Sequence, residues 1–377
     1  MKTYGALCLL SAVSTAWATC DQLRAIPNPL TEDMTITMSG DAVECPIDDN
    51  NEMEQFVIDG GILTLTGESK TTFVNMRFQV ADGAGLIFDF ERTTFGPSND
   101  YDRQDEYGIV YMLEVLEGGT AEFTGNLRVE ELGNMRSVFY NAGEIEFKGT
   151  ARFLDIRTSV LRVNTGKLRF RGNTVFKNIA YMALDNNGGD VRFSGTSRFQ
   201  HIGHSFNGNS GAGFGNFNDG KAVFRGDAIF KDNNCDENGG AVYNSGELTF
   251  YGKAYFWDNR AVDGSGGGVH HVGGDLTFKG AVQFLRNQSG EYGGGFAMQG
   301  GATVSFHKAV TFEDNQSNYN GGAMSFVDSS DESPAVCDFN KEPTFSGNFL
   351  YQDGDELCTE TYIESDADIT GYDPVCN

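Results

Sequence analysis

The segment Gly246–Asn259, GELTFYGKAYFWDN, contains one copy of a pattern that recurs along most of the chain. In general form the pattern reads N-x-G-[E/D/K]-apolar-x-F-x-G-x-x-x-F. Its first phenylalanine returns at intervals of 23 to 33 residues, and periods of this length indicate a repeat array. The copies are located by that phenylalanine, at Phe123, Phe147, Phe170, Phe193, Phe224, Phe250, Phe278, Phe306 and Phe339.

Apolar and polar residues alternate inside each copy. Leu248 and Phe250 alternate with Glu247 and Thr249, and a period of two is that of a strand. No copy contains an apolar run with the helical period of 3.6 residues, and glycines interrupt every copy. The pattern therefore predicts an all-β fold, a right-handed parallel β-helix of about eleven rungs with three strands in each rung.

Stacked rungs would place equivalent residues above one another, about 4.8 Å apart. Two internal columns of phenylalanine are expected, which accounts for 30 Phe in a chain with only 2 Trp. A column of asparagine is expected at one corner, where side-chain amides can bond along the stack. We interpret these repeated residues as structural. The expected asparagine column is Asn141, Asn164, Asn187, Asn218 and Asn244.

The chain begins with the features of a secretory signal peptide. Lys2 is followed by an apolar run that ends in Ala16-Trp-Ala18, so cleavage is expected after Ala18 and the protein is expected to be secreted or held at the cell surface. No other stretch approaches the roughly 20 apolar residues of a membrane span. We expect a signal peptide at 1–18, an N-terminal cap at 19–57, β-helix repeats at 58–348 and an acidic, cysteine-containing cap at 349–377.

The cysteines lie mainly near the two ends of the chain. Six would remain after removal of the signal peptide, and an even number in an exported protein predicts disulfides. One pair is expected between Cys20 and Cys45. At least one more is expected among the last three cysteines, Cys337, Cys358 and Cys376.

Short motifs within residues 230–348 carry a family resemblance. Gly239-Gly-Ala-Val242 and Gly321-Gly-Ala-Met324 alternate with segments such as Phe230-Lys-Asp-Asn233 and Phe312-Glu-Asp-Asn315. These motifs resemble the GGA[I/V/L] and FxxN repeats of the chlamydial polymorphic outer membrane proteins. The resemblance implies a surface-exposed right-handed β-helix with a role in adhesion.

The expected function is therefore that of a non-catalytic secreted or cell-surface module for adhesion, or for interaction with extracellular matrix or polysaccharide. The alternative is a polysaccharide lyase or epimerase of the pectate-lyase-like β-helix type, acting in a groove near the insertion at 201–217. Such an enzyme needs acid and base groups on one open face. The groupings His201-x-x-His204 and His270-His271 lack the further ligands of a metal site, and no catalytic residue is assigned.

The net charge of -26 makes one basic feature conspicuous. The residue after the first phenylalanine is basic in several copies, and such a stripe could bind sulfated or uronic polysaccharide or other cell-surface components. The alternative is that long basic side chains protect strand edges from aggregation. Nucleic acid is not an expected partner, because most of the surface would repel phosphates, and a monomer is expected. The stripe consists of Lys148, Arg171, Arg225 and Lys279.

Two further sets of residues recur at fixed places in the copies. Asp232, Asp258 and Asp314 share one position of F-x-D-N, and stacked carboxylates repel unless a cation or water intervenes, so Ca²⁺ is the one candidate cofactor. A solvated Asp-Asn corner is the alternative. Asn287 and Asn315 each begin an Asn-Gln-Ser sequon. They are glycosylation candidates, although we favour an internal role for both at the corner.

Overall fold

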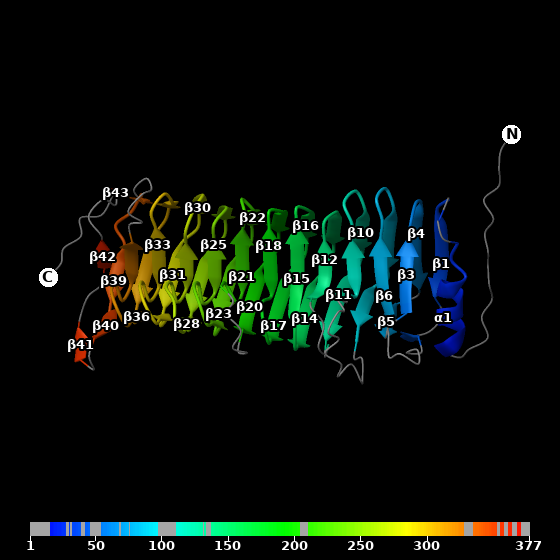
Figure 1. Ribbon diagram of the computed structural model, residues 1–377, viewed down its shortest axis with the longest axis horizontal. Coiled ribbons are helices and arrows are strands. Elements are labelled where there is room, and N and C mark those ends of the chain that lie inside the picture. The colour runs from blue at the N-terminus through cyan, green and yellow to red at the C-terminus, as the bar shows by residue number, and fades with distance from the viewer. Residues whose placement is uncertain are drawn as a thin grey trace.

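The fold is a right-handed parallel β-solenoid, as the sequence predicts, seen in a computed structural model in which successive rungs stack along one long axis (Figure 1). The structure describes residues 16–27, 30, 32–38, 42–45, 54–67, 69–74, 76–96, 111–130, 132, 137–203, 210–327, 335–352, 355–357, 361–363 and 368–370.

Three long parallel sheets, here called A, B and C, form the walls of the coil. Within the described residues sheet A has 13 strands and sheets B and C have 12 each. The strands of sheet A are β1 (Met34–Met38), β4 (Ile62–Gly67), β7 (Gly85–Asp89), β10 (Thr120–Phe123), β13 (Glu144–Phe147), β16 (Lys167–Phe170), β19 (Asp190–Phe193), β22 (Lys221–Phe224), β26 (Glu247–Phe250), β30 (Asp275–Phe278), β34 (Thr303–Phe306), β38 (Val336–Phe339) and β43 (Asp368–Thr370).

Sheets B and C follow sheet A in each rung. The strands of sheet B are β2 (Ala42–Glu44), β5 (Lys70–Val74), β8 (Arg92–Phe95), β11 (Asn126–Glu130), β14 (Ala151–Ile156), β17 (Thr174–Ile179), β20 (Ser197–Ile202), β23 (Ala228–Lys231), β27 (Ala254–Trp257), β31 (Val282–Leu285), β35 (Val310–Glu313) and β39 (Thr344–Ser346). The strands of sheet C are β3 (Glu54–Ile58), β6 (Met76–Val80), β9 (Leu113–Val115), β12 (Ser137–Asn141), β15 (Ser159–Asn164), β18 (Leu184–Asn187), β21 (Phe214–Phe217), β25 (Val242–Asn244), β29 (Val269–His271), β33 (Phe296–Gln299), β37 (Met324–Val327) and β42 (Thr361–Ile363).

A fourth, narrow sheet D was not predicted. It begins at β24, in the part of the chain where copies lengthen from 23 to between 26 and 33 residues, and its early strands are only two residues long. The extra residues of the longer rungs therefore form an additional wall. The strands of sheet D are β24 (Asn234–Cys235), β28 (Arg260–Ala261), β32 (Gln288–Ser289), β36 (Gln316–Ser317), β40 (Phe349–Gln352) and β41 (Asp355–Leu357), of which β40 and β41 pair antiparallel.

Two columns of phenylalanine fill the coil, as predicted. In sheet A, Phe224, Phe250 and Phe278 lie level with one another, and their stacked ring centroids are 4.8 and 5.0 Å apart. In sheet B, Phe256 and Phe284 stack at 4.9 Å. Edge-to-face contacts, such as that between Phe250 and Phe256 at 6.1 Å, join the two columns. Both geometries suit the charge distribution of aromatic rings, so each buried ring stabilises its neighbours in the column.

The predicted asparagine column was wrong by one position in two rungs and by two positions in a third. Because side chains alternate between the two faces of a strand, a slip of one residue exchanges inside for outside. Asn164 and Asn187 pair with each other on the outward-facing position, and Asn218 follows the end of β21. The inward column consists of Asn141, Asn186, Asn216 and Asn244, which are all fully buried. In the rung between Asn141 and Asn186 this position is occupied by Val163.

The coil extends into both segments that the sequence assigned to caps. Helix α1 (Ala16–Arg24) lies at one end beside β1 (Figure 1), but β1, β2 and β3 already form the first strands of the sheets before residue 58. Past residue 349, β42 and β43 pair with β37 and β38. Within the described part of the N-terminal segment, the helix is the element that covers the end of the coil. Among the described residues no helix has the length and apolar character to cross a bilayer.

Replacement of Phe250 by alanine tests the core. Phe250 is 1% exposed between Phe224 and Phe278, so Phe250→Ala should leave a cavity and lower the free energy of unfolding by about 3 to 5 kcal/mol. Tyr255→Ala, on the outer face of the adjacent strand β27, is the matched control and should cost about 1 kcal/mol or less. Equal losses for the two variants in denaturant melts would contradict the assignment of inner and outer faces.

Candidate functional site

The register of sheet A brings the predicted basic stripe into one column on its outer face. Lys148, Arg171 and Arg225 each follow an inward phenylalanine and donate a backbone hydrogen bond to the phenylalanine carbonyl of the preceding rung. Lys279 occupies the same position two rungs beyond Arg225. Ser194 lies between Arg171 and Arg225 in this column, and Tyr251 lies between Arg225 and Lys279.

The members of the stripe differ in how their charge is compensated. Lys148 pairs with Glu122 at 2.6 Å, and this hydrogen bond raises the pKa of the lysine. Arg171 pairs with Glu146. Lys279 donates to the Tyr251 hydroxyl at 3.3 Å, with its ammonium 4.4 Å from the ring centroid. The Arg225 guanidinium lies 5.8 Å from that centroid and has no carboxylate partner among the described residues.

A hollow opens where the stripe crosses the middle of sheet A. It encloses about 540 Å³, and its lining contains no carboxylate. Two of its arginines, Arg169 and Arg192, lie outside the predicted stripe because they occupy the outward position before the phenylalanine and not the one after it. The sequence does contain a signal for them, because both arginines occupy the x position of the apolar-x-F motif, which faces outward. The residues that line the hollow are Arg169, Arg171, Arg192, Ser194 and Arg225.

Acidic partners of this hollow lie at its margin. Arg169 pairs with Glu144 at 3.2 Å, and Arg192 pairs with Asp190 at 2.8 Å, a hydrogen bond that raises the pKa of Arg192. Arg169 and Arg192 are direct neighbours in the ladder between β16 and β19. Like charges at such a position repel and lower the stability of the sheet. The ion pairs with Glu144 and Asp190 offset this repulsion only in part.

The structure places the three aspartates of the expected calcium column at one backbone corner. Asp232, Asp258 and Asp314 form a left-handed backbone corner, with φ of 58°, 56° and 53°. Asp232 accepts from His201 Nδ1 at 2.7 Å, and Asp258 accepts from Arg286 Nε at 2.7 Å, so two of the carboxylates face basic side chains of adjacent rungs. Within the described part of the chain no three His, Cys, Asp or Glu side chains group in a way that could hold a metal ion.

The FxxN asparagines form a continuous internal ladder along the same corner. The Oδ1 of Asn287 accepts from both the backbone nitrogen and Nδ2 of Asn259, at 3.1 and 2.9 Å, and Asn287 donates in the same way to Asn315. The Nδ2 of Asn287 also donates to the carbonyl of Phe256 at 2.8 Å. Both sequon asparagines are fully buried. A glycan on either amide would require these bonds to break, so the folded ladder and glycosylation exclude each other.

Substitution of one ladder residue measures the strength of the corner. Asn287→Ala would remove the acceptor of the Asn259 backbone nitrogen and of one Asn259 Nδ2 hydrogen, and one donor to the Phe256 carbonyl, in a buried site. Each unsatisfied buried group costs about 1 to 3 kcal/mol, so the free energy of unfolding should fall by at least about 2 kcal/mol. Gln288→Ala, whose side chain is exposed in the next position, is the control. A loss below 1 kcal/mol for Asn287→Ala would contradict the ladder.

The paired histidines His270 and His271 lie inside the protein and not at an open site. His271 continues the inner asparagine column, with Nδ1 3.1 Å from Asn244 Nδ2 and Nε2 2.9 Å from the Thr303 carbonyl. His270 is 2% exposed, and neither of its ring nitrogens has a hydrogen-bond partner in the described structure. Burial lowers the pKa of His270 to about 3 and also lowers that of His271. Of the other predicted grouping, His204 lies outside the described residues.

These lowered pKa values predict a loss of stability in weak acid. Below pH 6.5 an unfolded His270 binds a proton, whereas the folded residue stays neutral down to about pH 3. Stability is therefore fully present above pH 6.5, and protonation of unfolded His270 should lower it by up to about 1.4 kcal/mol per pH unit as the pH decreases. Denaturant melts between pH 6.5 and 5 should show a smaller slope in His270→Ala. The exposed His307→Ala is the control, and an unchanged slope in His270→Ala would contradict the prediction.

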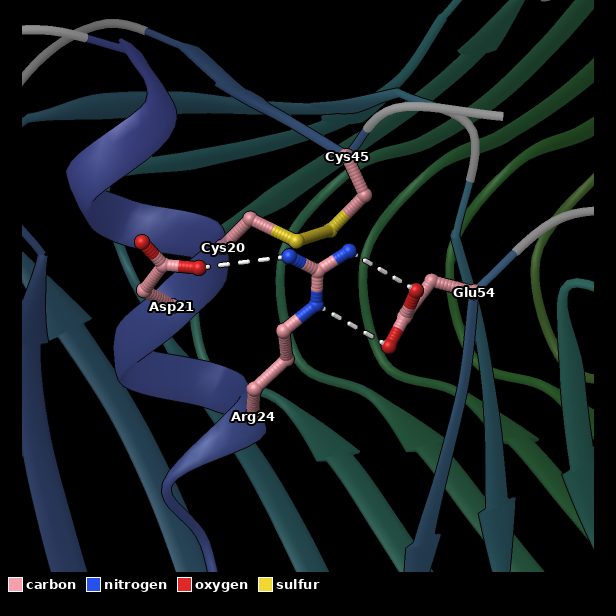
Figure 2. The surroundings of a disulfide bond; sticks show 5 residues. All are labelled: Cys20, Asp21, Arg24, Cys45 and Glu54. Carbon is pink, nitrogen blue, oxygen red and sulfur yellow. Dashed lines mark hydrogen bonds and ion pairs between the residues drawn. A yellow bond between two sulfur atoms is a disulfide. The ribbon is translucent and has the colours of Figure 1, made fainter. Parts of the chain in front are cut away.

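The predicted disulfide between Cys20 and Cys45 is present, with its Cα atoms 5.4 Å apart. It ties α1 to the segment after β2. Figure 2 shows Arg24 of the same helix beside it, donating to Asp21 and to both carboxylate oxygens of Glu54. Together these contacts hold the helix over the first rung.

Of the other cysteines, the structure describes Cys235 and Cys337. Cys337 is corrected as a disulfide candidate, because it is a free thiol inside β38 whose pKa burial raises well above the usual value. Cys235 is also free and buried, and burial raises its pKa to about 12. Cys358 and Cys376 lie outside the described residues.

A second polar grouping lies on the outer face of sheet C, next to the insertion at 201–217. Tyr140, Arg162 and Asp185 occupy one column on consecutive strands, and Arg162 Nε lies 3.6 Å from Asp185 Oδ2. Gly215 is level with Asp185 in the next rung, and the Phe217 ring fills the space beside this glycine. Burial raises the pKa of Asp185 despite the opposing influence of Arg162. Here an acid with a raised pKa lies beside an arginine, which is the arrangement that the alternative enzymatic interpretation requires.

Comparison with known proteins leaves the chain without an assigned relative. No family model, no curated protein and no solved structure matches it. The resemblance of its short motifs to the polymorphic outer membrane protein repeats therefore stays an expectation, and the function must be argued from the outer faces of the coil.

Proposed function

We propose that this protein is a non-catalytic extracellular module that binds anionic polysaccharide on the outer face of sheet A. The observation that carries the proposal is the hollow lined by Arg169, Arg171, Arg192, Ser194 and Arg225, with no carboxylate in its lining. A planar guanidinium donates two parallel hydrogen bonds to a carboxylate or sulfate group, and several of them around one hollow suit a chain that carries such groups in succession.

Protection of strand edges does not explain these arginines. Basic side chains guard an edge when its backbone groups are unpaired. Strands β16, β19 and β22 are internal to sheet A, with a parallel neighbour on both sides. The side chains of Arg171 and Arg225 therefore cover no open edge, and their position supports a role in binding.

The energetic cost of the cluster also supports a ligand. Arg169 and Arg192 face each other at rung spacing, and neighbouring like charges in a ladder destabilise a sheet. The protein has 53 acidic and 27 basic residues, so solubility does not require cations here. A bound anionic group would neutralise the part of this repulsion that the pairs with Glu144 and Asp190 leave uncompensated.

The secreted location and the adhesive role belong to the same proposal. A signal-like N-terminus and a disulfide between Cys20 and Cys45 suit an oxidising compartment outside the cytosol. A rigid coil with polyanion-binding side chains in register suits attachment to matrix or cell-surface glycans.

A polysaccharide lyase or epimerase is the second candidate function. Asp185, with its raised pKa, lies beside Arg162 and in the same column as Tyr140, and lyases use an arginine near the acidic sugar with a proton-transferring group. If the protein is a lyase, incubation with polygalacturonate or alginate should release unsaturated products that absorb in the ultraviolet. Asp185→Asn should abolish the formation of these products. An absence of turnover in the wild-type protein would reject this candidate.

The binding proposal is tested by charge reversal. Wild-type protein should be retained on dextran sulfate or polygalacturonate resin at low ionic strength and released by salt. Arg171→Glu combined with Arg225→Glu should abolish retention, because each reversal replaces an attraction with a repulsion while the screened contact itself contributes about 1 kcal/mol or less to folding.

The matched control reverses charge elsewhere on the coil. Arg260→Glu combined with Lys308→Glu makes the same change in net charge at exposed positions outside the hollow. This control should bind like the wild type, and melting temperatures should agree within a few degrees among all three proteins. Wild-type protein that flows through both resins at low ionic strength would overturn the proposal.

A further inference from the structure

The outer face of sheet B carries a second concentration of basic side chains, separate from the predicted stripe. In the strands of sheet B from β5 to β23, every rung has a basic residue at an outward position. The outward positions of these strands hold two acidic residues, Glu130 and the corner residue Asp155. These basic residues are Lys70, Arg92, Arg128, Arg152, Lys177, Arg198 and Lys231.

Three of these arginines surround a second hollow, of about 250 Å³. Arg128 and Arg152 are direct neighbours in the ladder between β11 and β14, and Arg92 is level with Asn126, two residues before Arg128. No carboxylate contributes to its lining, as in the hollow of sheet A. The lining consists of Arg92, Asn126, Leu127, Arg128, Thr150 and Arg152.

The charges on sheet B are less compensated than those on sheet A. Arg128 pairs with Glu130. No ion pair or side-chain hydrogen bond within the described structure joins the others to a partner, in contrast to Arg169, Arg171 and Arg192 on sheet A. The uncompensated side chains are Lys70, Arg92, Arg152, Lys177, Arg198 and Lys231.

The basic character ends abruptly along the coil. From β27 onward the outward positions of sheet B hold Tyr255 and Trp257, then Gln283 and Leu285, with no lysine or arginine. The fold does not require this change, because the internal phenylalanine column continues unaltered through Phe230, Phe256 and Phe284. The basic stretch is therefore a property of the surface and not of the repeat.

We propose that the outer face of sheet B, from β5 to β23, is a second binding face for anionic polysaccharide, centred on the hollow of Arg92, Arg128 and Arg152. This inference rests on the proposed function, since it names the same class of ligand, but it assigns a separate site. The sulfate or uronate groups of the ligand accept hydrogen bonds from the guanidinium groups.

The spacing of the face suits a polymer more than a single anion. Basic side chains that share a column follow the strand spacing of about 4.8 Å, so Arg152 and Arg198, two rungs apart in one column, present charges about 10 Å apart. A chain with regularly placed anionic groups can engage several of these side chains at once. Binding through several weak contacts on one chain raises the overall affinity well above that of each contact.

The experiment compares reversals on the two faces. Affinity for dextran sulfate and for polygalacturonate is measured by titration at low and physiological ionic strength. Arg152→Glu combined with Arg198→Glu should weaken binding of at least one polymer by about tenfold or more, since two contacts of up to about 1 kcal/mol are lost and two repulsions are added. The polymer that is weakened shows whether sulfate or carboxylate groups are bound at this face.

Two controls keep the result interpretable. Arg260→Glu combined with Lys308→Glu has the same net charge and should bind within about twofold of the wild type, because screening limits the effect of remote charges. Arg152→Gln combined with Arg198→Gln removes the cations without adding acids, and should give a smaller loss in the same direction with an unchanged melting temperature. This neutral variant decides the question if the glutamate variant folds poorly.

The possible outcomes separate the two proposals. Loss of binding in the sheet A variant Arg171→Glu/Arg225→Glu, with wild-type affinity in both sheet B variants, would overturn the second face and leave the proposed function intact. Loss in the sheet B variants alone would support the second face and remove the hollow of sheet A as the site. Wild-type protein that binds neither polymer would overturn both.

Discussion

The stacking of like residues on like in parallel register is the interaction on which the rest of the structure depends. Phe250 can pack face to face with Phe224 and Phe278 because each copy places the ring at the same height and the same wall. The same register acts on the outside of the strand. Any outward residue type that recurs beside the phenylalanines therefore forms a column on the surface. A repeat whose core residues recur thus also aligns its surface charges in columns.

The polar interior follows the same rule with a stricter requirement. A buried amide is tolerated when its donors and acceptors are all used, and the ladder through Asn259, Asn287 and Asn315 meets this condition because each residue repeats the bonds of the one before. The left-handed corner at Asp258 and Asp314 precedes each ladder residue and turns the chain into it. The aspartates that suggested a cation site thus take their position from the backbone of the corner.

The sequence predicted the coil because alternation and copy length are local and repeated, whereas details that depend on exact register were beyond it. Asn164 and Asn187 follow the same motif as Asn141 but lie one position later in the strand, and only the hydrogen-bonded pairing shows this. Sheet D forms from the extra residues of the longer rungs, and the path of those residues is not evident from the repeat pattern. Arg169 and Arg192 were missed because a hollow is formed by three neighbouring rungs and is not visible in one copy.

Net charge is a poor guide to where such a protein can bind. At physiological ionic strength charges are screened over about 8 Å, less than two rungs, so acids elsewhere on a protein of charge -26 do not cancel the field at the hollows. What matters locally is whether each cation has its own carboxylate. Arg171 has one in Glu146, whereas Arg152 has none in the described structure. A polyanion must displace or share the partners on sheet A, but on sheet B it meets side chains whose hydrogen bonds are still to be made. The two faces should therefore differ in salt sensitivity, with sheet B contributing more of the long-range attraction and sheet A more of the orientation of the bound chain.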